Sequence, residues 1–240
     1  MRIDRVLPVA DVVSRIHHDL APLSASSVSA VREVRRRHAK ELAQQDAPTI
    51  MAVATALFDA GTWPARLVAC ELVNGRRDVR QRLSVAMVER WAKGLADWGS
   101  IDLYGVTVAG VAWREARIQD ERVMRWAHSD DRWRRRLALV STVPLNSRAR
   151  GGNGDATRTL AICRTLIDDR DDMVVKALSW ALRELAKRDR ESVRRFMRKE
   201  DARLASRVRR EVTSKLETGY KVRPRPKRAK MSQTPVRTTR

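Results

Sequence analysis

Residues 171–188, DDMVVKALSWALRELAKR, decide the fold class, because their apolar side chains recur at the period of an α-helix. The residues that share this apolar stripe are Val174, Leu178, Ala181, Leu182 and Leu185. Trp180 does not belong to the stripe, since at about 100° per residue it points roughly opposite Leu178. We therefore expect an amphipathic helix that buries one face and carries a tryptophan on another.

The rest of the chain repeats this helical pattern between short polar, glycine or proline joints. The sequence has only ten Gly, two Tyr and two Phe, and it contains no alternating β-branched run bounded by turn residues. We expect helices over residues 7–20, 27–44, 48–60, 77–95, 98–109, 116–127, 131–142, 155–168, 171–188, 190–199 and 201–217, with a further helix after Pro64. The predicted fold class is all-α.

Helices joined this closely predict stacked antiparallel pairs, because each pair can bury its apolar stripe only against its neighbours. We expect residues 1–218 to form a curved solenoid of antiparallel HEAT-like helix pairs with a concave basic groove. Residues 219–240 carry eight basic side chains, three prolines and no acidic side chain, so they cannot form a core. We interpret them as a disordered basic tail that attracts DNA; the alternative is a segment that only improves solubility.

The charge of the chain indicates a polyanionic partner. Lys and Arg number 50 against 29 Asp and Glu, which makes the net charge +21 at pH 7, and nucleic acid is the commonest partner of such a protein. The four histidines have no zinc-site spacing with either cysteine, and no glycine-rich phosphate loop is present. We therefore expect a monomer that binds DNA and uses no metal and no cofactor.

The two cysteines and the hydropathy pattern bear on the compartment. Cys70 and Cys163 lie far apart in apolar helical contexts, which predicts buried free thiols in a reducing environment. The N-terminus lacks the apolar core of a signal peptide, and no stretch of about 18 apolar residues is present. We expect a cytoplasmic protein of bacterial type, associated with the nucleoid and not with a membrane.

A second stretch, residues 96–102 (ADWGSID), places a tryptophan and a carboxylate four residues apart. On a helix that spacing puts Trp98 and Asp102 on one face. Asp97 is a suitable N-cap, which would start the helix near Trp98 and leave Asp102 ionised close to the positive end of the helix dipole. The alternative is a core tryptophan beside a solvated aspartate.

Cations cluster on the faces of two predicted helices. Trp180 shares its face with Lys176, Arg183 and Lys187, a combination that suits stacking on a base or sugar beside phosphate-binding charges. On the helix over residues 131–142, the candidates for phosphate contact are Arg132, Arg135 and Arg136. The alternatives are burial of Trp180 against another helix and an ordinary solvated face for the arginines.

Three segments together resemble the DNA alkylation repair family of HEAT-like-repeat DNA glycosylases. Residues 98–102 (WGSID) are similar to the family's Trp-Asp-x-x-Asp segment, and residues 129–138 (SDDRWRRRLA) are similar to its Trp-x-x-Arg-Ala-Ala helix. Residues 176–187 (KALSWALRELAK) are similar to its Lys-Ala-x-x-Trp-x-Leu-Arg-Glu helix. The order and the approximate spacing of the segments also agree with the family.

The resemblance implies roles for four residues. Asp102 would be the catalytic carboxylate, Trp98 and Trp180 would line the lesion cleft, and Arg136 would hold the DNA backbone. The chain departs from the family pattern at Gly99, where the family has an acidic residue. It also lacks the aromatic of the N-terminal helices, which would fall near residues 16–18.

The resemblance further implies a monofunctional glycosylase that removes cationic N3- and N7-alkylated purines from duplex DNA without a deep base-flipping pocket. A fixed carboxylate suits this chemistry, because the alkylated base is already a good leaving group and only the cationic sugar needs stabilisation. Two alternatives stay open. One is a non-catalytic HEAT-like module that binds damaged, bent or branched DNA, and the other is a helical scaffold for protein partners.

Overall fold

The computed structural model describes residues 8–23 and 27–222, and within these ranges the chain is all-α, as predicted. The α-helices are α1 (Val9–Leu20), α2 (Val28–Glu41), α3 (Ala47–Asp59), α4 (Trp63–Gly75), α5 (Arg77–Arg80), α6 (Val85–Ala92), α7 (Trp98–Tyr104), α8 (Gly110–Arg114), α9 (Asp120–Ala127), α10 (Arg132–Val140), α11 (Val143–Asn146), α12 (Ala156–Thr165), α13 (Asp172–Leu185), α14 (Arg190–Lys199) and α15 (Ser206–Thr218). The predicted tail, residues 219–240, lies outside the described residues except for its first four.

Several predicted boundaries are wrong for identifiable reasons. The helix expected over residues 77–95 is two helices, α5 and α6, because the Ser84 hydroxyl caps Met87 N at 3.2 Å and starts α6 anew. The helix expected over residues 116–127 begins only at Asp120, since Ala116 adopts a left-handed φ of 55°. The helix expected over residues 98–109 instead continues to Arg114 through a π-helical turn, Gly105–Ala109.

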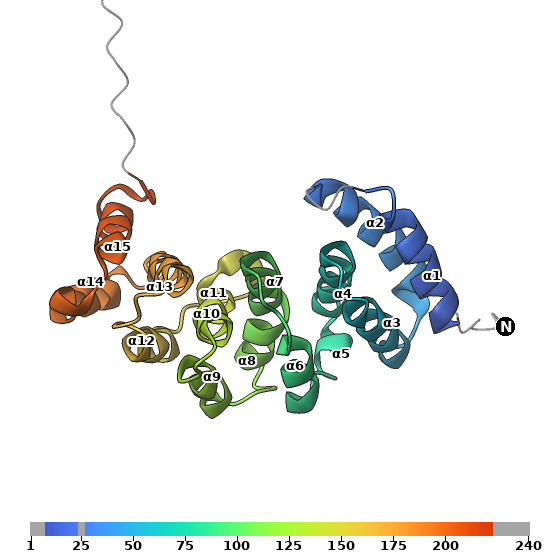
Figure 1. The fold of residues 1–240 in the computed structure, drawn as a ribbon, viewed down its shortest axis with the longest axis horizontal. Coiled ribbons are helices and arrows are strands. Elements are labelled where there is room, and N and C mark those ends of the chain that lie inside the picture. The colour runs from blue at the N-terminus through green and yellow to red at the C-terminus, as the bar shows by residue number, and fades with distance from the viewer. Residues whose placement is uncertain (1–7, 24–26, 223–240) are drawn as a thin grey trace, which may run out of the picture.

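The helices form two layers along an arc (Figure 1). The inner layer contains α2, α4, α7, α10, α13 and α15, and each of these helices contacts the next. The outer layer contains α1, α3, α6, α9, α12 and α14, with contacts between α1 and α3 and between α9 and α12. The chain alternates between the layers, so helices far apart in the sequence line the concave side together.

Many ion pairs between neighbouring parts of the arc span a sequence interval of 33 to 36 residues, whereas others span 26, 31, 39 or 45 residues. Arg122 and Glu89 are 33 residues apart, and Arg35 and Glu71 are 36 apart. Further pairs within this interval are Arg80–Glu115, Arg135–Asp169, Arg164–Glu200 and Arg203–Asp168. Such a recurring interval is typical of stacked helix pairs of similar length, although the sequence shows no crisp repeat.

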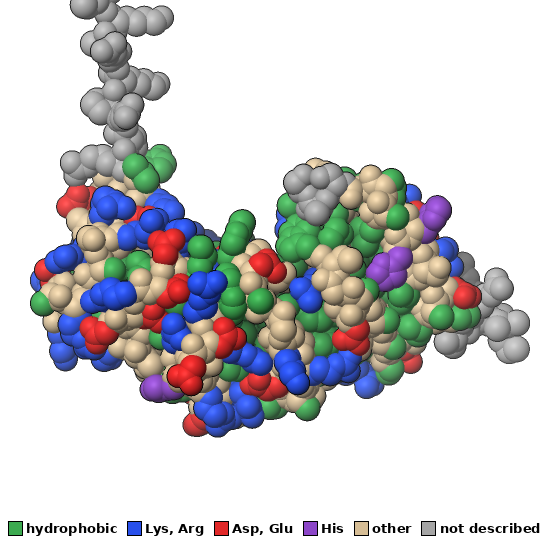
Figure 2. Space-filling view, in the orientation of Figure 1, with side chains coloured by type: hydrophobic (Ala, Val, Ile, Leu, Met, Phe, Trp, Pro, Cys, Tyr) green, Lys and Arg blue, Asp and Glu red, His purple; other side chains and the backbone are tan. Residues whose placement is uncertain are grey.

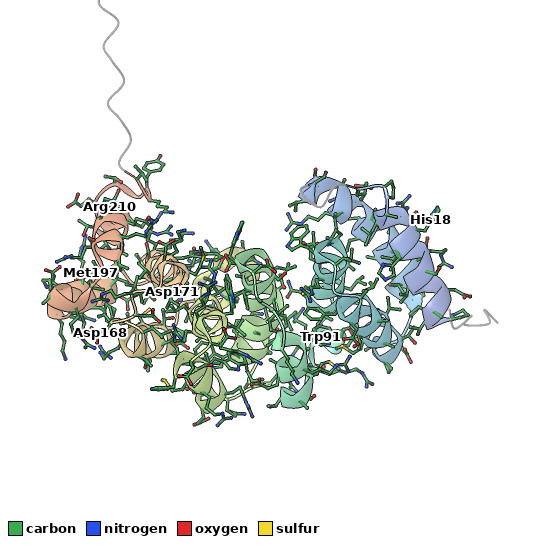
Figure 3. The ribbon with its side chains drawn as sticks, viewed as in Figure 1. His18, Trp91, Asp168, Asp171, Met197 and Arg210 are labelled. Atoms are coloured by element: carbon green, nitrogen blue, oxygen red, sulfur yellow. The ribbon has the colours of Figure 1, made fainter. Side chains whose placement is uncertain are left out.

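The predicted apolar stripes are buried. Val174, Leu178 and Leu185 of α13 are at most 1% exposed, and so are Val31 and Leu42 in the N-terminal part. On α6, Trp91 lies inside the molecule, where its ring stacks on Phe58 with centroids 4.6 Å apart (Figure 3). A continuous core therefore runs along the arc between the two layers.

Both cysteines are free and buried, as predicted. Burial raises the pKa of the Cys70 thiol to about 12, although the Thr107 side chain opposes the shift. Burial also raises the pKa of Cys163 well above its usual range. A thiol with so high a pKa carries no thiolate near neutral pH, so neither cysteine is a nucleophile. Among the described residues, no helix has the length and apolar character needed to cross a membrane.

Candidate active site

A cleft opens on the concave side between α2 and α4 on one wall and α7 with its π-helical turn on the other. Figure 2 shows this face of the molecule hollowed at the same place. The cleft encloses about 490 Å³. Its charged and aromatic lining residues are Arg32, Arg35, Trp63, Glu71, Asp102, Arg150 and Trp180.

Asp102 reaches this cleft because α7 starts where the sequence predicts. The Asp97 carboxylate accepts a hydrogen bond from Ser100 N at 2.8 Å, which makes Asp97 the N-cap and Trp98 the first helical residue. The next turn of α7 is anchored by Tyr104, whose hydroxyl donates to the Val88 carbonyl at 2.7 Å. The carboxylate of Asp102 is thus carried by a short helix that is fixed at both ends.

Arg136 holds the Asp102 carboxylate by two parallel bonds. Its Nε lies 2.8 Å from Oδ1 and its Nη2 lies 2.7 Å from Oδ2. Its Nη1 donates to the carbonyl of Met173, at the start of α13. The Arg136 side chain is 6% exposed and the Asp102 side chain 20% exposed, so the carboxylate alone faces the cleft. A bidentate pair of this kind fixes both position and orientation.

Burial raises the pKa of Asp102, and this effect exceeds the lowering by the Arg136 hydrogen bonds and charge. Asp97 adds a small further increase. The prediction from the helix dipole alone therefore missed the main influence, which is desolvation. A carboxylate held in a partly dry site interacts strongly with a cation placed next to it, because water screens it less.

Two tryptophans wall the cleft near Asp102. Trp180 of α13 is half-buried and lines the cleft, which agrees with the orientation predicted from its helical position. Trp63, the first residue of α4, lines the opposite wall. Its indole approaches Gly99 so closely that a Cβ there would lie 3.4 Å from Trp63 Nε1. At this position the chain has glycine instead of the family's acidic residue, and the nearest atom to a Cβ there would be Asp97 Oδ1, at 3.2 Å.

Trp98 lies one turn before Asp102 and is 61% exposed. The alternative reading of Trp98 as a core tryptophan is therefore wrong. Trp98 is not among the described residues that line the cleft, so its predicted role as a cleft wall stays a prediction. An exposed indole presents a large apolar face, which suits contact with a ligand.

The arginines of α10 are placed differently from one another. Arg136 was predicted to hold the DNA backbone, but in this structure it is buried and bonded to Asp102, so phosphate cannot reach it. Arg135 is also engaged, with Asp169 at 2.7 Å and with the carbonyls of Ser129 and Asp130. Only Arg132 is exposed, at 53%, and its phosphate contact stays a prediction.

The cations predicted around Trp180 also divide. Lys176 and Lys187 are 40% and 49% exposed, and each pairs with an acidic residue of its own helix. Arg183 instead turns inward, and its Nε lies 3.2 Å from Ser179 Oγ of the same helix and 3.8 Å from Glu211 of α15. Burial lowers the pKa of Arg183. The phosphate contact of the two lysines stays a prediction, whereas Arg183 contacts Glu211 of α15.

The family model of the DNA alkylation repair enzymes matches residues 9–216, nearly all of the described chain. The chain belongs to this family. No match to an individual curated protein accompanies the family match. Membership assigns the protein an enzymatic role in the repair of alkylated DNA, with DNA as the substrate.

The described residues contain no group of three or more His, Cys, Asp or Glu side chains that could hold a metal ion. Sequence reasoning missed five charged or aromatic residues of the cleft: Arg32, Arg35, Trp63, Glu71 and Arg150. Trp63 lies in the segment Gly61-Thr62-Trp63-Pro64, whose glycine and proline predict only a turn. The signal that could have identified it is Pro64, because proline is favoured in the first turn of a helix and would have placed Trp63 at the start of α4.

Proposed function

We propose that the protein is a monofunctional DNA glycosylase that excises cationic N3- and N7-alkylated purines from duplex DNA. The observation that carries this proposal is the Asp102 carboxylate, held by Arg136 with one face open to a cleft walled by Trp63 and Trp180. The proposal specifies which bond the repair reaction breaks, namely the N-glycosidic bond of the damaged nucleotide.

The chemistry follows from the charge of the substrate. An N3- or N7-alkylpurine is cationic, so the base leaves with the electron pair of the glycosidic bond and becomes neutral without being protonated. Positive charge develops on the sugar as this bond breaks, and water then adds to the anomeric carbon and releases a proton to solvent. Asp102 would stabilise this charge and orient the water, because a preorganised carboxylate in a partly dry cleft acts without reorganisation. Tryptophan faces favour the cationic nucleotide through their quadrupoles.

A non-catalytic module for damaged, bent or branched DNA is the second candidate. It is favoured by the Asp102–Arg136 ion pair, because Arg136 offsets the charge that catalysis needs. In the glycosylase, the same pair would keep the carboxylate ionised despite its burial. The two candidates therefore differ in whether base is released, and not in whether DNA binds.

The test is single-turnover release of 7-methylguanine and 3-methyladenine from methylated duplex, with protein in excess. Asp102→Asn removes the charge but keeps the shape, so we expect excision to fall by about 10²-fold or more while DNA affinity is kept. Asp169→Asn is the matched control. It breaks the Arg135–Asp169 pair, which has the same sequence separation of 34 residues but lies outside the cleft.

The control should excise within threefold of the parent protein, and melting curves should show how much stability each variant loses. An Asp102→Asn rate within threefold of the parent would remove Asp102 from the mechanism. Parent protein that binds methylated duplex but releases no base would establish the non-catalytic module.

A further inference from the structure

Arg150 is a half-buried arginine on the cleft wall whose guanidinium has no hydrogen-bond or ion-pair partner among the described residues. Its cleft neighbours Arg32 and Arg35 both bind Glu71, with distances of 2.7 and 3.1 Å from their Nε atoms. An arginine partly removed from water normally acquires a partner, because desolvating an unpaired charge is costly. The Arg150 guanidinium is therefore available to a ligand that enters the cleft.

The backbone holds Arg150 in place. It ends the short turn Arg148–Arg150, and its carbonyl accepts a hydrogen bond from Arg114. The next residue, Gly151, adopts a left-handed φ of 80°. Gly152 lies so close to the backbone of α11 that a Cβ there would be 2.3 Å from the Pro144 carbonyl oxygen. The position of Arg150 is thus set by backbone contacts that leave its side chain free to bind.

The electrostatics of this wall favour an added anion. Burial, followed by the charge of Arg32 across the cleft, lowers the pKa of Arg150. Glu184 and Glu71 act in the opposite direction, but Glu184 is bonded to Lys187, and Glu71 is shared by Arg32 and Arg35. Three arginines therefore face a cleft that contains two carboxylates, and one of these, Asp102, is already paired with Arg136.

We propose that Arg150, with Arg32 opposite, binds one phosphodiester group of the DNA strand and thereby positions the damaged nucleotide against Asp102. This inference rests on the proposed function, because it names the group that holds the substrate in the same cleft. A guanidinium presents N–H donors in a planar fork that matches two phosphate oxygens. The site takes over the backbone contact that buried Arg136 cannot make. Arg150 is a positioning residue, since it touches the phosphate and not the bond that breaks.

The test places one methylphosphonate at a time along a duplex that carries 7-methylguanine on a 2′-fluoro sugar. The 2′-fluoro sugar resists cleavage, so the lesion stays intact and fixes the position of the protein on the duplex. Each methylphosphonate removes one backbone charge, and affinity is measured by fluorescence anisotropy. For the parent protein, we expect one position beside the lesion to lower affinity about tenfold, the scale of one charge-assisted hydrogen bond. For Arg150→Gln, the same position should have no further effect.

Two further variants sharpen the test. Arg148→Gln is the matched control, because Arg148 lies in the same turn, is exposed and does not line the cleft. It should leave the position-specific penalty intact. Arg150→Gln should also reduce the slope of log affinity against log salt by about one. Arg150→Lys should keep this slope but bind less tightly. If Arg150→Gln melts much earlier than the parent, Arg150→Lys takes its place in the methylphosphonate scan, where it should weaken the position-specific penalty.

The outcomes separate this inference from the proposed function. If no position couples to Arg150, or if Arg150→Gln retains the full penalty, the phosphate site is wrong even when the parent protein releases base. If the coupling is found but no alkylated base is released, the phosphate site stands and the glycosylase proposal fails.

Discussion

At the scale of single residues, Asp102 is governed by two opposing influences, burial and Arg136. Burial raises its pKa and Arg136 lowers it, with burial the larger. A raised pKa means that the carboxylate takes up a proton at a higher pH than an ordinary aspartate does. Since the proposed mechanism needs the ionised form, acid should inactivate this protein earlier than it would inactivate a site with a solvated aspartate.

Arg136→Lys should move that acid limit to still higher pH. Lysine keeps a positive charge but cannot make the two parallel bonds, so the ionised carboxylate loses stabilisation and the pKa of Asp102 rises. The measurement is the single-turnover excision rate from pH 4 upward for both proteins, with circular dichroism at each pH to verify folding. A midpoint that is unchanged or lower in Arg136→Lys would show that Asp102 is not the titrating group.

The tryptophans divide into core and cleft residues, and stability should reveal the division. Trp91 is 1% exposed and stacked on Phe58, so Trp91→Ala should cost about 3 to 5 kcal/mol, the range for large-to-small core changes. Trp180 is only half-buried, so Trp180→Ala should cost clearly less while it reduces excision. Thermal melting and single-turnover rates test both statements. Equal losses of stability would place Trp180 in the core.

At the scale of elements, the long helix from Trp98 to Arg114 depends on two glycines that border its π-helical turn. A Cβ at Gly105 would lie 2.7 Å from Val140 Cγ1, and a Cβ at Gly110 would lie 2.4 Å from the Ser141 carbonyl oxygen. The first contact is with a side chain and the second is with backbone. The two glycines thus let the helix from Trp98 to Arg114 pack closely against α10 and the residues that follow it.

Alanine at these glycines should therefore destabilise the protein in a fixed order. Gly110→Ala should cost the most, about 1 to 3 kcal/mol, because backbone of the next element must move. Gly105→Ala should cost less, since its Cβ would meet the side chains of Val140 and Leu137 and not backbone. Gly75→Ala is the control: nothing lies within 4 Å of its Cβ, and the loss of unfolded-state freedom should leave stability unchanged or slightly higher. Melting temperatures that do not follow this order would contradict the packing described for α7 and α10.

At the scale of the whole molecule, the charge is divided between the helical arc and the basic tail. The arc keeps much of its positive charge in ion pairs between neighbouring helices, such as Arg164–Glu200 and Arg203–Asp168. These pairs already cancel in the net charge of +21, of which the eight basic side chains of residues 219–240 supply +8 and residues 1–218 the remaining +13. Attraction to any duplex should consequently depend strongly on the tail.

Deletion of residues 223–240 should lower affinity for any duplex and flatten its salt dependence, while single-turnover excision at saturating protein stays nearly unchanged. This boundary keeps the contact between Lys221 and Glu211, which lie 3.6 Å apart, and the left-handed Gly219 that ends α15. Anisotropy titrations at several salt concentrations measure the first effect, and excision at saturation measures the second. Loss of excision at saturation would show that the tail does more than attract DNA.

The sequence by itself determined the features that a single segment encodes. The all-α class, the buried stripe of α13, the Asp97 cap and the outward direction of Trp180 follow from helical period and local capping, which involve residues within a few turns of one another. The same reasoning placed Trp98 and Asp102 on one face of α7. The same reasoning did not predict the breaks between helices at Ser84 and Ala116, because the apolar pattern continues through these turns.

The tertiary structure alone decided which side chains meet. Arg136 pairs with Asp102 across 34 residues, and it does so because α7 and α10 are neighbours in the inner layer. Trp63 and Arg150 line the same cleft from segments with no sequence signal in common. Such contacts depend on which helices stack against each other. Stacking is set by the burial of apolar helix faces that are distant in the sequence, and many sequences have similar apolar faces. For that reason, the sequence could name the carboxylate, but only the fold could show what holds it and what surrounds it.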